Sequence, residues 1–196
     1  MSDSSQLYFL DRRERPRRKE LEEIDSPYLL ADWHLPIGWL AMLAPRDLNI
    51  DSSASRDNEK PYFAVECTTA IARLDERLIW LKSAVPGLQT AWFDSFRRFV
   101  SDSKFSWVHI DPIGISEVID DDSVAESERL IGLLGAFKDA PTPIDAVVMS
   151  NSNNHSGWDA YCAHFSTPFR DTTYPLWAAC FGASGTELLA PWEGGL

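Results

Sequence analysis

Two consecutive amphipathic segments constrain the fold of this chain more than any other feature. Apolar residues recur every three or four positions over about residues 62–85 and again over about residues 89–101, a spacing that predicts two helices. Pro86-Gly87 ends the first segment, so only a tight turn separates the two. Because antiparallel helices joined by a short turn bury their facing sides, we expect an aromatic stripe of the second segment to lie in the core. The stripe consists of Trp92, Phe93, Phe96, Phe99 and Val100.

The flanking segments predict strands and shorter helices. The apolar run 6–10 and the alternating residues 105–110 have the pattern of strands, the second with both sides covered. Ser26-Pro27 indicates a helix start for a segment through Trp33, and Pro36 indicates a second start for a helix that Pro45 stops. The remaining expectations are a polar loop over 46–60, a helix at about 123–138, a strand over 144–149, a short helix around 158–165 and a final strand over 175–181.

These elements predict an α+β fold: a helix-majority single domain over residues 1–196 with a small mixed or antiparallel sheet, and with a possible subdivision near residue 104. Hydrophobic residues make up 44% of the chain and charged residues 24%, which excludes global disorder. No apolar run approaches the roughly 20 residues of a membrane span, and the start Met1-Ser-Asp-Ser-Ser lacks the regions of a secretory signal. We therefore expect a cytoplasmic protein that does not enter a membrane.

The net charge of −12 is concentrated in the second half of the chain. Residues 1–104 hold 15 Lys or Arg and 17 Asp or Glu, a net of −2, whereas residues 105–196 hold three bases and 13 acids, a net of −10. Phosphate backbones are bound through Lys and Arg, so direct nucleic-acid binding by the second half is disfavoured and a basic protein is its natural complement. Solubility alone is the alternative explanation of the acidic composition.

A basic run interrupts this pattern, with six bases among the eight residues from Arg12 to Lys19. Pro16 breaks the run, and Glu20, Glu22 and Glu23 follow it. We expect a solvated connector that pairs locally with these acids. The alternative is a regulatory or scaffold domain that uses the run to hold nucleic acid.

The sequence offers no strong catalytic motif. Ser184 lies outside a G-x-S-x-G pattern, and Cys162 and His164 are two residues apart, so on a helix their side chains would diverge. Cys67, Cys162 and Cys180 are widely spaced and are expected to be buried thiols. We expect no catalytic residue.

Metal binding rests on dispersed residues. The best set is His155, Asp159 and His164, with His109 and Asp111 as additions from a strand. On a helix His155 and Asp159 share a face, but His164 would lie nearly opposite. A metal-dependent hydrolase is therefore an alternative, while the expectation is a protein without metal or cofactor.

Three features of the first half carry a resemblance. Tyr8, Leu10 and Asp11 form a short motif, Asp32-Trp33-His34-Leu35-Pro36 opens a helix, and the long amphipathic segment 62–85 follows. This arrangement, with the size and acidity of the chain, resembles bacterial immunity proteins that accompany contact-delivered toxins of polymorphic or type VI secretion systems. The resemblance implies an inhibitor that binds a cognate toxin and masks its active site in interbacterial competition.

A basic, nuclease-type toxin would be met by carboxylates, because opposite charge accelerates association. A buried Trp would act as an anchor at the centre of the interface. The expected partner-binding residues are Glu117, Asp120, Asp121, Asp122, Glu126, Trp158 and Trp192. Capping and the N-terminal charge of a helix starting at Ser123 also account for part of this acid cluster.

Overall fold

A five-stranded antiparallel sheet organises the part of the chain that the computed structural model describes, residues 4–16, 26–32, 35–50, 61–84, 87–111 and 176–183. Its strands are β1 (Ser4–Leu10), β2 (Tyr28–Asp32), β3 (Leu48–Ile50), β4 (Pro61–Glu66) and β5 (Trp107–Asp111). Their spatial order is β2-β1-β5-β4-β3, and every neighbouring pair is antiparallel. The last strand in the sequence, β5, therefore lies at the centre.

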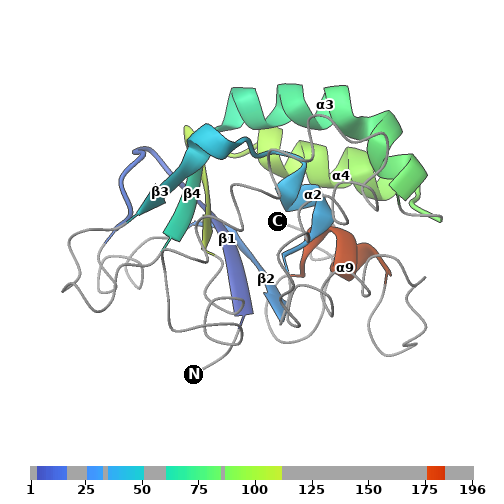
Figure 1. Ribbon diagram of the computed structural model, residues 1–196, viewed down its shortest axis with the longest axis horizontal. Helices are drawn as coiled ribbons and strands as arrows, with labels where there is room; N and C mark the ends of the chain where they lie inside the picture. Colours follow the sequence, from blue (N-terminus) through green and yellow to red (C-terminus); the bar gives the residue numbers. More distant parts are fainter. Residues whose placement is uncertain are drawn as a thin grey trace, which may run out of the picture.

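Two helices cover one face of this sheet, which we call the inner face. Helices α3 (Cys67–Ala84) and α4 (Thr90–Ser101) lie side by side above the strands (Figure 1). Apolar residues at alternate strand positions form one cluster with the buried side chains of both helices. The strand members are Leu7, Phe9, Leu29, Ala31, Phe63, Val65, Val108 and Ile110. The alternation of a pleated strand thus places one set of side chains in the core.

The C-terminal helix α9 (Leu176–Phe181) packs against the short helix α2 (Ile37–Leu40) (Figure 1). The indole nitrogen of Trp39 donates a hydrogen bond of 2.7 Å to the carbonyl of Phe181. Gly182 follows with φ at 78°, and a Cβ atom at this position would lie 2.5 Å from the Trp39 ring. Only glycine permits both this conformation and this close approach.

The residue after this glycine closes one edge of the sheet. Leu30 of β2 and Ala183 exchange two backbone hydrogen bonds of 2.8 and 2.9 Å. An unpaired strand edge invites pairing with another chain, so this bridge protects β2. The C-terminal segment is therefore part of the same folded unit as the first half of the chain.

The structure corrects the predicted fold class. The α+β class is right, but a helix-majority domain with a small sheet is wrong. Helix accounts for 45% of the described part and strand for 27%, so helix is not the majority, and the sheet has five strands. The physical reason is that β2, β3 and β4 come from segments that the sequence assigned to helices and a loop.

Three local predictions failed for related reasons. Residues 28–32 form β2 instead of a helix, and the Ser26 hydroxyl accepts a hydrogen bond from the backbone N–H of Phe9 at 3.0 Å instead of capping a helix. Residues 61–66 form β4 because pairing with β3 and β5 overrides the helical spacing of Phe63. Residues 176–181 form α9 where a strand was expected.

Other local predictions are confirmed. Strands β1 and β5 match the runs 6–10 and 105–110, and Val108 to Asp111 are buried as expected of a strand covered on both sides. Helix α4 matches residues 89–101, with Phe93, Phe96 and Val100 in the core. Helix α3 matches the long amphipathic segment from Cys67 onward.

The helix expected after Pro36 is confirmed only over the four residues of α2, and Pro45 begins a 3-10 turn, η1 (Pro45–Asp47), that leads into β3. The helices expected at 123–138 and 158–165 and the strand at 144–149 lie outside the described residues. The extent of a single domain stays a prediction. Among the helices that the structure describes, none combines the length and the apolar character needed to cross a membrane.

Candidate functional site

Polar and aromatic side chains gather on the outer face of the sheet, opposite α3 and α4. Tyr8 of β1 lies directly across from His109 of β5, and the register places Gln6 opposite Asp111. The Tyr8 and His109 rings stack at 5.3 Å, and the Tyr62 ring of β4 stacks on the other side of His109 at 6.2 Å. Tyr8, Tyr62, His109 and Asp111 are all buried. We call these four residues the outer-face cluster.

His109 is the centre of this cluster. Its Nε2 atom lies 2.8 Å from the carbonyl oxygen of Arg12. A carbonyl only accepts, so Nε2 carries the proton, and burial lowers the pKa of His109 to about 4, which keeps the ring neutral. The Nδ1 atom therefore presents a lone pair, and it has no hydrogen-bond partner among the described residues.

A charged pair lies beside the aromatic stack. The guanidinium of Arg15 donates to the Asp111 carboxylate and forms an ion pair with it, across 96 positions of sequence. Burial, followed by the negative charge of Asp111, raises the pKa of the Tyr8 hydroxyl, while Arg15 acts in the opposite direction. The Tyr8 hydroxyl is thus protonated and lies within electrostatic reach of both charges.

The segment that supplies Arg15 follows β1 directly and folds back over β5. We call residues 11–16 the strap. Besides the contacts of Arg12 and Arg15, the Arg13 guanidinium lies 6.0 Å from the centre of the Trp107 ring. The expected local pairing of the basic run is therefore wrong for Arg15, whose partner is on a distant strand. Residues 17–25, which hold the rest of the run and its nearby acids, lie outside the described residues.

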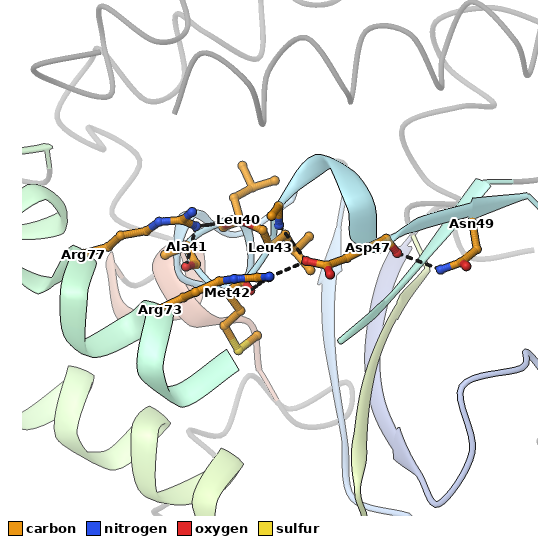
Figure 2. Close-up of polar contacts among 9 residues, drawn as sticks. Leu40, Ala41, Met42, Leu43, Asp47, Asn49, Arg73 and Arg77 are labelled. Carbon is orange, nitrogen blue, oxygen red and sulfur yellow. Dashed lines mark hydrogen bonds and ion pairs between the residues drawn. The ribbon is translucent and has the colours of Figure 1, made fainter. Parts of the chain in front are cut away.

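A second polar arrangement joins α3 to the turn after α2 (Figure 2). The Arg73 guanidinium donates to the carbonyl of Met42 at 2.8 Å and also pairs with Asp47. One turn further along α3, Arg77 donates to the carbonyls of Ala41 and Leu43, each at 2.8 Å. The two arginines face the same way because they are four residues apart on one helix.

These contacts satisfy backbone carbonyls of the turn that follows α2, which have no helical partners. The Asp47 carboxylate also accepts from the backbone N–H of Ala44 at 2.7 Å, which fixes the turn into β3. Burial, and then the neighbouring charge of Arg73, lowers the pKa of Arg77, although a guanidinium stays charged at any physiological pH. The arrangement is structural: it joins helix, turn and sheet edge.

The described cysteines are buried thiols, as expected. Burial raises the pKa of Cys67 to about 11 and that of Cys180 to about 12. The Cys67 thiol donates to the carbonyl of Phe105 at 3.3 Å. Both thiols are therefore protonated at neutral pH and are poor nucleophiles. Cys162 lies outside the described residues.

The structure places only part of the predicted sites. Of the five metal-ligand candidates, His109 and Asp111 are on one face of β5, but they already bind the Arg12 carbonyl and the Arg15 guanidinium. Within the described ranges no three His, Cys, Asp or Glu side chains come close enough to hold a metal ion. The other candidates, metal-ligating and partner-binding, lie outside those ranges: Glu117, Asp120, Asp121, Asp122, Glu126, His155, Trp158, Asp159, His164 and Trp192.

Sequence reasoning missed the outer-face cluster as a unit. The alternation of residues 105–110 placed His109 opposite Val108 and Ile110, which was a usable signal. The position of Tyr8 across from His109 required the pairing of β1 with β5, strands about a hundred residues apart. No local pattern specifies such a pairing.

Comparison of the chain with protein-family models, with curated proteins and with solved structures found no significant match. We therefore infer function from the charge and geometry of this chain.

Proposed function

We propose that this protein is a cytoplasmic inhibitor that binds a basic protein partner, and that the partner is a cognate bacterial toxin whose active site it masks. In this proposal the protein is an immunity protein, and its acid-rich second half supplies the binding carboxylates. The observation that carries the proposal is the segregation of charge along the chain, −2 in residues 1–104 and −10 in residues 105–196.

The residues that the structure describes, which we call the scaffold, support this proposal because three of their arginines pair with acids of the scaffold itself. Arg15 pairs with Asp111, Arg73 with Asp47, and Arg97 with Asp75 through two hydrogen bonds of 2.6 and 2.8 Å. By contrast, the sequence from 112 to 128 contains six acids and no Lys or Arg. Acids without neighbouring bases attract a cationic partner over several ångströms and accelerate encounter.

The expected interface combines these acids with an aromatic anchor. The candidate carboxylates are Glu117, Asp120, Asp121, Asp122 and Glu126, and the candidate anchors are Trp158 and Trp192. Charges of this kind mainly set the association rate, whereas a buried Trp mainly slows dissociation. The two groups of residues therefore make separable contributions to affinity.

The decisive experiment is co-expression with the product of the adjacent gene, followed by growth measurement and co-purification. We expect growth to be rescued and a stable complex to be isolated. If the neighbouring protein is harmless, or is toxic but neither neutralised nor bound, the proposal is wrong.

Charge neutralisation then tests the mechanism. In the test variant, Gln or Asn replaces the five acids Glu117, Asp120, Asp121, Asp122 and Glu126. We expect the variant to associate with the toxin about tenfold more slowly, and we expect its association rate to depend less on salt. The matched control removes the same charge from exposed acids of the scaffold, Glu14, Glu66, Glu76, Asp94 and Asp102. Equal effects of the two variants would mean that only net charge matters.

A further inference from the structure

Polar contacts among the described residues attach the strap to the outer face. One is the hydrogen bond between the Arg12 carbonyl and His109, and another is the ion pair of Arg15 with Asp111. The strap residues from Asp11 to Glu14 are exposed, whereas Asp111 and His109 beneath are buried. The strap therefore contacts a buried carboxylate and a buried imidazole directly.

We propose that Tyr8, His109 and Asp111 form a guanidinium-binding surface, that Arg15 occupies it in the free protein, and that an arginine side chain of a basic partner replaces Arg15 on binding. This inference rests on the proposed function for the nature of the partner, and it adds a specific receiving site on the scaffold. The strap is then an intramolecular competitor of the partner.

The acceptor groups favour a guanidinium over an ammonium ion. The Nδ1 lone pair of His109 has no hydrogen-bond partner among the described residues, and the Tyr8 hydroxyl lies close enough to Arg15 and Asp111 for both to act on its pKa. A guanidinium has five N–H donors in one plane, so it can serve several acceptors at once, whereas an ammonium ion acts as a point charge. A partner arginine that reaches these acceptors competes effectively with Arg15.

The burial of Asp111 determines how the exchange proceeds. Removal of the Arg15 guanidinium from the buried Asp111 carboxylate is unfavourable, so release of Arg15 is easier when another cation takes its place. Neutral or acidic partners do not supply that replacement. The strap thereby adds selectivity for cationic partners, at the expense of some affinity, because part of the binding free energy displaces Arg15.

The test uses a fluorescent oligoarginine peptide as the probe, at low salt, with the full chain. Arg15→Gln removes the competitor, and we expect it to bind the peptide about tenfold more tightly than the native chain. Arg13→Gln is the matched control, since it removes the same charge from the same strap but from a residue that lies over Trp107. We expect less than a twofold change for this control. Asp111→Asn added to Arg15→Gln should abolish the gain.

A second measurement on the native chain is independent of how well the variants fold. Hydrogen exchange of the strap amides should increase when oligoarginine is added, and much less with oligolysine of equal length. Equal gains in Arg13→Gln and Arg15→Gln, or unchanged exchange with oligoarginine, would overturn the proposal. The acid-to-amide variant of residues 117–126 separates the two proposals, because its loss of toxin binding does not depend on Arg15.

Discussion

The two faces of the sheet bury their side chains by different interactions. The inner face buries Phe9, Phe63 and Val108 against α3 and α4, so its stability comes from close apolar packing. The outer face buries an imidazole, two phenols and a carboxylate, which must be matched by hydrogen bonds and a counter-charge from the strap. Apolar packing tolerates changes in pH and salt, whereas the polar face is sensitive to both. The outer face is therefore the side of the sheet on which conditions or a partner can act.

The largest expected effect is on the inner face. Phe96→Ala removes a ring that stacks on Phe181 at 4.8 Å and leaves a cavity between α4 and α9. We expect the free energy of unfolding to fall by about 3–5 kcal/mol, measured by urea denaturation. The matched control is Ile79→Ala on α3, because the Ile79 side chain is 84% exposed. We expect this variant to change the free energy of unfolding by less than about 0.5 kcal/mol. Similar losses would contradict the assignment of the core.

On the outer face, we expect the cost of losing a charge to depend on its partner. Arg15→Met removes a cation that pairs with the buried Asp111 carboxylate, and the expected loss of stability is about 3–4 kcal/mol. The double variant Arg15→Met/Asp111→Leu should recover most of this loss because no buried charge remains. A double variant as unstable as Arg15→Met would show that the ion pair stabilises the fold by more than the neutralisation of its two charges.

Acid should weaken the outer face specifically. The pKa of His109 is lowered from 6.5 to about 4 in the folded chain. Between pH 6.5 and pH 4, His109 is therefore protonated in the unfolded chain but neutral in the folded chain. The contribution of His109 to stability is complete above pH 6.5 and is lost as the pH falls toward 4, by about 3 kcal/mol in total. Subtracting the profile of His109→Gln from that of the native chain isolates this contribution. A flat difference profile would mean that the ring is protonated or exposed.

The smallest expected effect is on the solvent side of the helices. Arg97 of α4 and Asp75 of α3 form a bidentate pair, but their side chains are 37% and 47% exposed. We expect Arg97→Gln to lower stability by only about 0.2–1 kcal/mol, and less in high salt. A loss as large as that of Arg15→Met would remove the distinction between buried and exposed ion pairs.

Local patterns predicted what local physics controls. Helix α4 was predictable because its aromatic stripe has helical spacing and marks one buried side. Strand β5 was predictable because both alternating sets of its residues include apolar side chains. Residues 28–32 were not predictable, because the start signal at Ser26-Pro27 is outweighed by pairing of β2 with β1 and with Ala183. Strand β4 was not predictable either, because Phe63 fits helical and strand spacing equally well. A short segment takes the structure that buries it best, and its neighbours decide which structure that is.

The amino-acid sequence by itself determined the α+β class, the helix pair and the uneven distribution of charge, since each depends on residue spacing or composition. Only the tertiary structure decided that Arg15 meets Asp111, that Tyr8 stacks on His109, and that Ala183 closes the edge of β2. These contacts join residues about 100 to 150 positions apart. They depend on strand order and register, which are properties of the whole chain rather than of any one segment.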